Sequence, residues 1–353
     1  MPLASMTDRR RRSARSPRRL VGALAVGALA LGLGACGADA AGSAAGSSGA
    51  TGGESVTIEH AFGETVIEGT PERVATVAWG NHEVPLALGV VPVGMAATTW
   101  GDDDGDGVMP WVEEKLEELG AETPVLFDEE DGIDFEAVAE SDPDVILAAY
   151  SGLSEEDYQT LSEIAPVVAF PDTAWGTDWR ETILMNAAGM GRAEEGQALV
   201  AEYEALIEEK AADYPALAGK AAMFLTHVDE ADLSTVSYYS TLDTRVQYFE
   251  DLGMTSPESV IAESEANGTY SVEQSAETAD EFADAELIVT YGGDELLEAL
   301  KADPILSQMP AVANEAVVAL PGDGPIGNAA NPTALSLPWY LDEYLKMLSD
   351  AIE

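Results

Sequence analysis

Residues 193–214, AEEGQALVAEYEALIEEKAADY, form a long helix signal that contains no proline. Apolar residues recur in it at steps of three and four, which predicts one apolar stripe along a helix. The stripe consists of Leu199, Val200, Tyr203, Leu206 and Ile207. Gly191 precedes the segment and Pro215 ends it. We expect this helix to join two halves of the protein.

The stretches on either side of this helix resemble each other. Residues 134–152 read DFEAVAESDPDVILAAYSG, and residues 271–293 read SVEQSAETADEFADAELIVTYGG. Each has a polar residue, a spacer and a glutamate, then a short helix signal, an acidic turn, an apolar strand, a tyrosine and a glycine. In the second stretch, this pattern predicts a helix over residues 273–282. The chain is thus predicted to contain two comparable α/β units.

The rest of the chain repeats an order of strand, turn, helix and strand. Residues 55–69 alternate in polarity and turn at Gly63, which predicts a β-hairpin. Strand signals at 74–79 and 90–95 then flank a short helix signal, and a similar order returns beyond Pro215, with strand signals at 222–227 and 287–291. This rhythm is typical of the α/β class with mainly parallel sheets.

The start of the chain has the composition of a signal peptide. Residues 9–19 carry seven arginines, and residues 20–35 carry no charge. The apolar run is short for a membrane span, which needs about 20 residues. We therefore expect residues 1–35 to direct export, through the general route or the twin-arginine route.

A lipid anchor is predicted at Cys36, the only cysteine in the chain. The preceding residues complete the sequence LGAC at 33–36, which resembles a bacterial lipobox. Residues 36–54 are rich in glycine, alanine and serine, which predicts a flexible tether. We expect the exported protein to be held on the outer face of the bacterial cell membrane through this lipid alone.

The chain is strongly acidic, with a formal net charge of −49 at pH 7. This charge excludes nucleic acid as a partner, because the phosphate backbone would be repelled. A hydrophobic content of 46% still indicates a globular protein. About 300 residues follow the tether, which suits two lobes of ordinary domain size. We place the lobes at 55–192 and 215–353, with the connecting helix at 193–214.

Several stretches in the correct order resemble the iron–siderophore and cobalamin class of substrate-binding proteins of ABC importers. They are PERVATVAWGNHEVPLALGVVPVG at 71–94, IDFEAVAESDPDVILAAYSGL at 133–153, DTRVQYFEDLGM at 243–254, SVEQ at 271–274 and NPTALSLPWYLDEY at 331–344. The resemblance implies two Rossmann-like lobes joined by a single long helix, with the ligand held in the cleft between them. It also implies a monomer that captures a ferric siderophore, needs no cofactor, and delivers the ligand to an importer permease and its ATPase. Haem or cobalamin binding on the same fold is the alternative.

Two glutamates, Glu136 and Glu273, match the positions that dock this family on its permease. Two anions on rigid lobes would orient a two-lobed protein on a two-fold partner. The competing interpretation is an ordinary acidic residue in the first turn of a helix, where it favours the helix dipole.

Candidate ligand-binding residues follow predicted strands or lie in the loops after them. Ligands of open α/β sheets bind beyond the carboxyl ends of the strands. These candidates are Trp79, Trp100, Tyr150, Trp175, Arg180, Tyr238 and Arg245. Tyr291 also ends a predicted strand, and only some of these aromatic residues are expected to line a pocket. Guanidinium groups suit the oxygens around ferric iron, and aromatic rings suit the organic shell. The alternatives are aromatic residues in the core and arginines paired with nearby acids.

The acidic loop DDDGDG at 102–107 fits a calcium-loop pattern when Glu113 is included. Its candidate ligands are Asp102, Asp104, Asp106 and Glu113. Against calcium, Pro110 occupies the ninth position of the pattern, and no helix signal precedes the loop. An acidic chain also makes chance matches common.

No catalytic motif is complete in the sequence. His82-Glu83 begins a zinc-protease pattern, but Leu86 stands where the second histidine belongs. The chain also lacks G-x-S-x-G and a phosphate-binding loop. We therefore expect a binding protein and not an enzyme, with a secreted surface enzyme as the alternative from another class.

Charge also bears on the kind of ligand. A ferric triscatecholate carries three negative charges, and the candidate cleft cations are Arg180 and Arg245. We therefore predict a neutral or cationic ferric chelate, a hydroxamate in preference to a triscatecholate. The alternative is that positive helix ends gather around an anion.

Overall fold

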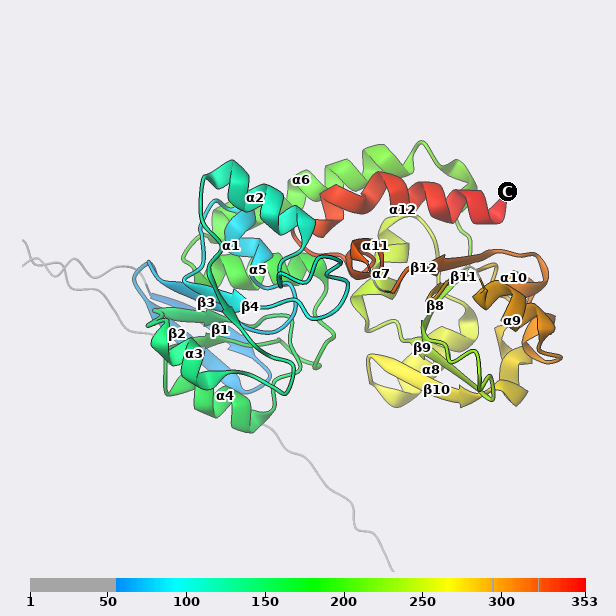
Figure 1. Ribbon diagram of the computed structural model, residues 1–353, viewed down its shortest axis with the longest axis horizontal. Helices are drawn as coiled ribbons and strands as arrows, with labels where there is room; N and C mark the ends of the chain where they lie inside the picture. Colours follow the sequence, from blue (N-terminus) through cyan, green and yellow to red (C-terminus); the bar gives the residue numbers. More distant parts are fainter. Residues whose placement is uncertain (1–54, 294, 323) are drawn as a thin grey trace, which may run out of the picture. The chain divides into compact units, whose positions relative to one another are not determined.

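The computed structural model describes residues 55–353, except residues 294 and 323. The predicted signal peptide, the anchor at Cys36 and the tether lie outside these residues. The described chain contains a β-hairpin, two five-stranded sheets and the helices that cover them (Figure 1). Within this part of the chain, no helix combines the length and the apolar character needed to cross a bilayer.

The N-terminal sheet is wholly parallel, as the strand and helix rhythm predicts. Its order is β5 (Val125–Phe127), β4 (Gly94–Ala96), β3 (Val74–Thr76), β6 (Val145–Leu147) and β7 (Val167–Val168). Its helices are α1 (Glu83–Ala87), α2 (Pro110–Leu119), α3 (Phe135–Glu140), α4 (Glu155–Ser162) and α5 (Trp179–Gly189). The predicted hairpin is confirmed as β1 (Ser55–His60) and β2 (Gly63–Glu68), which pair antiparallel.

The C-terminal sheet is mixed. Its order is β10 (Ser271–Ser275), β9 (Thr235–Tyr239), β8 (Ala222–His227), β11 (Leu287–Tyr291) and β12 (Val317–Leu320). Strands β8, β11 and β12 are parallel, and β9 and β10 are antiparallel additions at one edge. Every residue of β11 is buried, as expected for a strand that is covered on both faces. The helices around this sheet are α7 (Thr244–Asp251), α8 (Glu258–Asn267), α9 (Leu296–Ala302), α10 (Pro310–Ala313) and α11 (Pro325–Ala329).

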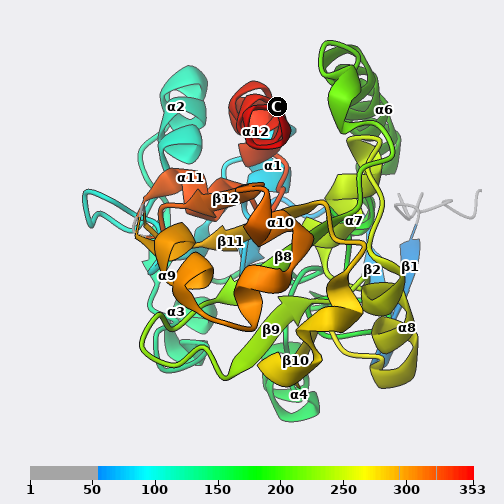
Figure 2. The same ribbon diagram turned by 90° about the vertical axis from the view of Figure 1, so that its right-hand side faces the viewer.

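Helices α6 (Ala193–Ala211) and α12 (Ser336–Ile352) pack against each other, and α12 lies above the C-terminal half in the view of Figure 1; Figure 2 shows the two helices from the end. The hydroxyl of Tyr203 on α6 donates to the carbonyl of Ala334 at 2.6 Å. The predicted connecting helix is therefore present, although it ends at Ala211 instead of residue 214.

The chain also returns to the N-terminal lobe near its end. The buried carboxylate of Glu83 on α1 accepts hydrogen bonds from the hydroxyl of Thr333 and the amides of Leu335 and Ser336. Helix α6 carries the chain from one half to the other, and these hydrogen bonds add a contact between segments that are distant in the sequence. The lobe boundaries at 55–192 and 215–353 stay predictions.

The predicted helix over residues 273–282 is wrong in where it begins and in its type. Residues Ser271–Ser275 form strand β10, which pairs with β9, and a 3₁₀ helix follows over Ala276–Phe282. The Ser275 side chain accepts from the amide of Glu277 and so caps this turn. Strand β9 was not predicted, and without its partner the β10 sequence does not show a strand pattern.

Candidate functional site

A cavity of about 240 Å³ lies where the loops of the two sheets meet. Its walls come from both halves of the described chain. They are Trp79, Trp100, Tyr150, Trp175, His227, Tyr239, Asp243, Arg245, Tyr270, Tyr291 and Asn331. Several of these residues follow directly on parallel strands, where ligands of α/β sheets bind. Five of the seven predicted ligand-binding residues are among them.

Trp100 connects the aromatic walls of the two halves. Its ring centroid lies 6.1 Å from that of Trp79 in the N-terminal half. It also meets Tyr291 at 5.1 Å and His227 at 5.7 Å, both edge-on, from the C-terminal half. Asn328 fixes the loop by donating to the Trp100 carbonyl at 2.8 Å. The aromatic wall therefore spans the cleft between the sheets.

A turn with unusual backbone angles presents Trp79. Ala78 has a φ of 59° and Gly80 has a φ of 69°, both in the left-handed region. Asn81 supports this turn through hydrogen bonds. Its Nδ2 donates to the carbonyls of Val77 and Tyr150, both at 2.8 Å. Its Oδ1 accepts from the Tyr150 amide at 3.0 Å. One buried amide thus positions the loops that carry both Trp79 and Tyr150.

Trp175 lies against the loop after β6. Its own φ is 61°, and its amide donates to the Ser151 carbonyl at 2.9 Å. A Cβ placed on Gly152 would lie 2.1 Å from the Trp175 Nε1, so only glycine fits there. Trp175 also packs edge-on against Tyr150, with centroids 5.4 Å apart.

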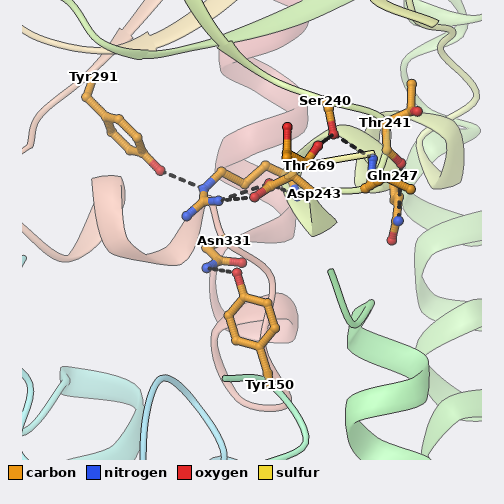
Figure 3. Close-up of polar contacts among 10 residues, drawn as sticks. Tyr150, Ser240, Thr241, Asp243, Gln247, Thr269, Tyr291 and Asn331 are labelled. Atoms are coloured by element: carbon orange, nitrogen blue, oxygen red, sulfur yellow. Dashed lines mark hydrogen bonds and ion pairs between the residues drawn. The ribbon is translucent and has the colours of Figure 1, made fainter. Parts of the chain in front are cut away.

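Arg245 is the only cation among the described residues that line this cavity. Its Nη1 donates to both carboxylate oxygens of Asp243, at 2.9 and 2.7 Å, and its Nε donates to the Tyr291 hydroxyl at 2.9 Å. The guanidinium carbon lies 4.0 Å from the Tyr239 ring centroid. Figure 3 shows Tyr291 and Asp243 apart from each other, with the bond from Asn331 to the Tyr150 hydroxyl below them.

The ion pair with Asp243 controls the charge of Arg245. Burial alone would lower the pKa of Arg245, but the fully buried Asp243 carboxylate reverses this and holds the pKa well above its usual value. Within the described chain, no group accepts a hydrogen bond from Nη2. Arg245 therefore keeps N–H donors for a ligand, while most of its net charge is neutralised locally.

His227 carries no charge at neutral pH. Burial lowers its pKa, and the charge of Arg245 lowers it further. The ring stacks on Tyr291 with centroids 4.8 Å apart. His227 thus acts as part of the aromatic wall.

Two predicted residues lie elsewhere. Tyr238 is fully buried and packs on Phe282, because side chains alternate along β9 and its neighbour Tyr239 faces the cavity instead. Arg180 pairs with Glu204 of α6 at 2.7 Å and with Asp251 of α7 at 2.8 Å. It therefore connects three helices away from the aromatic walls.

Several cavity residues were missed by sequence reasoning. They are His227, Tyr239, Asp243, Tyr270 and Asn331. Tyr291, which the sequence places at the end of an apolar strand before a glycine as it does Tyr150, also lines the cavity. Asp243 reads as the cap of helix α7, a role that it also performs, so its ion pair with Arg245 could not be recognised.

The two proposed docking glutamates are both exposed. Glu136 lies in the first turn of α3, behind the cap formed by Asp134. Glu273 lies in the middle of β10, with the Ser237 hydroxyl 3.4 Å from its Oε2. Their local settings therefore differ, unlike the matched helix starts that the repeat predicts.

The acidic loop does bring carboxylates together. Oxygens of Asp102, Asp104 and Asp106 lie within 4.8 Å of one another. Glu113 follows in the first turn of α2, and partial burial and the charges of Asp106 and Asp104 raise its pKa. Calcium binding by this loop stays a prediction.

The family is shown by comparison with known proteins. The profile described as "Periplasmic binding protein" matches residues 74–323, more than half of the chain. The protein therefore belongs to the periplasmic binding protein family, which places it among binding proteins and not among enzymes.

Individual proteins are also similar to this chain. The structure of PiaA from Streptococcus pneumoniae TIGR4 in complex with ferrichrome is 43% identical, with a TM-score of 0.81, and covers 84% of this chain and 98% of PiaA. Staphylococcus aureus SirA complexed with staphyloferrin B is 21% identical, with a TM-score of 0.64 over 83% of this chain and 98% of SirA, and supports the fold alone. A probable siderophore-binding lipoprotein of Bacillus subtilis strain 168, YfiY, is 28% identical over 154 residues. That alignment covers 43% of this chain and 44% of YfiY, less than half of each.

Proposed function

We propose that this protein captures a ferric siderophore and delivers it to the permease of an ABC importer. The siderophore would bind in the cavity of about 240 Å³ described above, which we call the aromatic cavity. The observation that carries the proposal is the cavity itself, where aromatic rings from both halves surround the partly free guanidinium of Arg245. Aromatic rings suit the organic shell of a chelate, and N–H donors suit the oxygens around its iron. The likeness to PiaA, whose structure holds ferrichrome, supports the same conclusion.

The charge of the cavity favours a neutral or cationic chelate over a triscatecholate. Asp243 offsets the charge of Arg245, and no other cation lines the cavity among the described residues. A trianion would therefore lose its hydration without a matching positive charge, which is unfavourable by several kcal/mol. A neutral ferric trihydroxamate such as ferrichrome needs only stacking and a few donors.

Tryptophan fluorescence tests the proposal, because a ferric chelate quenches nearby indoles. The purified protein is titrated with a ferric trihydroxamate, a ferric triscatecholate, haem and cobalamin, each at two salt concentrations. We expect saturable quenching that is tightest with the trihydroxamate. Tighter binding of the triscatecholate at both salt concentrations would contradict the charge argument, and exclusive binding of haem or cobalamin would contradict the siderophore assignment.

Two tryptophan variants locate the bound ligand. Trp100→Phe removes an indole from the cavity wall, whereas Trp339→Phe removes one that is 36% exposed on α12. We expect Trp100→Phe to lose a large part of the quenching and Trp339→Phe to keep it. The opposite pattern would place the ligand elsewhere.

Delivery to the permease is proposed to use the exposed anions Glu136 and Glu273. They lie in different halves of the described chain, so two cations on a membrane partner would fix the orientation of the protein. We propose that a lipid on Cys36 keeps the protein near that permease and its ATPase. Cys36→Ala should release the protein into the medium or leave the precursor uncleaved, and a membrane-bound variant of normal mature size would contradict this anchor.

A further inference from the structure

A second cavity, of about 320 Å³, adjoins the aromatic cavity. The two cavities share Trp79 and Trp175 as walls. The second cavity extends into the N-terminal half, among the loops that follow β3, β4 and β5. We call it the side cavity. A ligand that lies between the two tryptophans would have access to both spaces.

The side cavity presents a carboxylate oxygen without a partner. Glu129 follows β5, and its Oε2 accepts from the Ala78 amide at 2.9 Å. Its Oε1 is buried, and no described group donates to it. The other acids on this wall serve the local structure: Glu83 accepts from the Trp111 indole at 2.8 Å, and Asp157 accepts from the amide and hydroxyl of Ser154, the N-cap of helix α4. The Oε1 of Glu129 is thus a buried acceptor on this wall that has no described partner.

No fixed positive charge competes for this carboxylate. Among the described residues, neither lysine nor arginine lines the side cavity. His82 does line it and is 6% exposed, and its Nδ1 also has no described partner. Burial lowers the pKa of His82 to about 4, so its ring is neutral at physiological pH. Burial raises the pKa of Glu129 to about 7, although its bond from the Ala78 amide opposes this.

The polarities of the two cavities are complementary. The aromatic cavity offers donors through Arg245, which suit the anionic oxygens around iron. The side cavity offers an unpaired acceptor, and a buried acceptor without a donor is unfavourable. A ligand that fills both spaces should therefore carry acceptors around its metal and a strong donor on an arm. An ammonium group meets the second requirement best, because it also pairs with the charge of Glu129.

We propose that the side cavity is a second subsite, in which Glu129 binds the primary ammonium group on a pendant arm of a ferric trihydroxamate. This inference rests on the proposed function and narrows its ligand class. The iron centre lies in the aromatic cavity, and the arm passes between Trp79 and Trp175. Glu129 acts here as a specificity-determining residue.

The test compares two ligands that differ only at the end of the arm. One is a linear ferric trihydroxamate that ends in a primary amine, and the other is the same chelate with that amine acetylated. Both are titrated at pH 8, where the Glu129 carboxylate is mainly ionised. We expect the wild-type protein to bind the amine form about tenfold more tightly, because only its ammonium group pairs with the charged Glu129 carboxylate. A tenfold ratio equals the interaction free energy of one pKa unit.

Matched variants separate charge from size. Glu129→Gln keeps the shape of the side chain and the acceptor for the Ala78 amide, and we expect it to bind both ligands within about twofold of each other. Glu130→Gln changes the exposed neighbour and should keep the wild-type preference. If the preference persists in Glu129→Gln, the acetyl group is rejected by its size and the subsite assignment is overturned.

The wild-type titrations alone also decide the proposal, so it does not depend on the folding of a variant. Equal, tight binding of the two ligands would overturn the subsite and leave siderophore capture standing. Binding of neither ligand would overturn the subsite, and a parallel titration with ferrichrome would then show whether siderophore capture stands.

Discussion

Replacing Asn81 with alanine should disrupt both the fold and the ligand cavity. Asn81 is fully buried, and it bonds the carbonyl and the amide of Tyr150, the carbonyl of Val77 and the amide group of Asn186. Alanine cannot replace any of these bonds. The turn that carries Trp79 would therefore lose the hydrogen bonds that support it.

The expected cost follows from the groups left unpaired. Three buried backbone groups, two on Tyr150 and one on Val77, lose their partner. Each unpaired group costs about 1–3 kcal/mol, and local relaxation recovers part of this. We expect Asn81→Ala to lower the free energy of unfolding by about 3–5 kcal/mol, which is large for a single substitution. In a protein of this size, the melting temperature should fall by roughly 5–8 °C.

Asn267→Ala is the matched control. Asn267 is exposed, and its side chain bonds only to Glu263 within the same helix. Thermal unfolding of the two variants, followed by circular dichroism, should show a large decrease for Asn81→Ala and a change within about 0.5 kcal/mol for Asn267→Ala. Siderophore affinity should also fall in Asn81→Ala, because Trp79 and Tyr150 lose their common support. Similar melting temperatures for the two variants would refute the reasoning.

Three further predictions concern docking, calcium and pH. The double variant Glu136→Ala and Glu273→Ala should bind siderophore normally in titrations yet import it poorly in cells, and normal uptake would argue against docking. Calcium at millimolar concentration should raise the melting temperature only if the acidic loop binds it, and an equal rise in Asp104→Ala would rule out that site. Burial raises the pKa of Glu129 to about 7, so its contribution to stability is greatest at low pH and is lost as the pH rises through 7. Glu129→Gln should therefore gain about 2 kcal/mol relative to wild type between pH 5 and pH 8 in urea unfolding, and an unchanged difference would contradict the raised pKa.

Local sequence patterns predict most of the elements that position the cavity. Strands β8 and β11 are apolar runs bounded by turn signals, and their predicted limits match the structure. The alternation at 55–69 likewise predicts the hairpin. These elements could be recognised because burial on one or both faces leaves a direct mark on the sequence.

Features that depend on contacts between distant parts of the chain could not be predicted from the sequence. Strand β10 depends on β9 for its hydrogen bonds, so a stretch of serines and acids was interpreted as a helix. The choice between Tyr238 and Tyr239 depends on which face of β9 is covered, and that is decided by residues far along the chain. The partners of Arg180 lie on two other helices, so its ion pairs could not be predicted from the local sequence either.

The position of the iron tests the central claim most directly. Crystals of the protein grown with a ferric trihydroxamate can be measured at the iron absorption edge, where anomalous scattering locates the metal. We predict a single strong iron peak inside the cavity bounded by Trp79, Trp100 and Arg245. A peak at the acidic loop around Asp104, or anywhere outside that cavity, would contradict this account of the site.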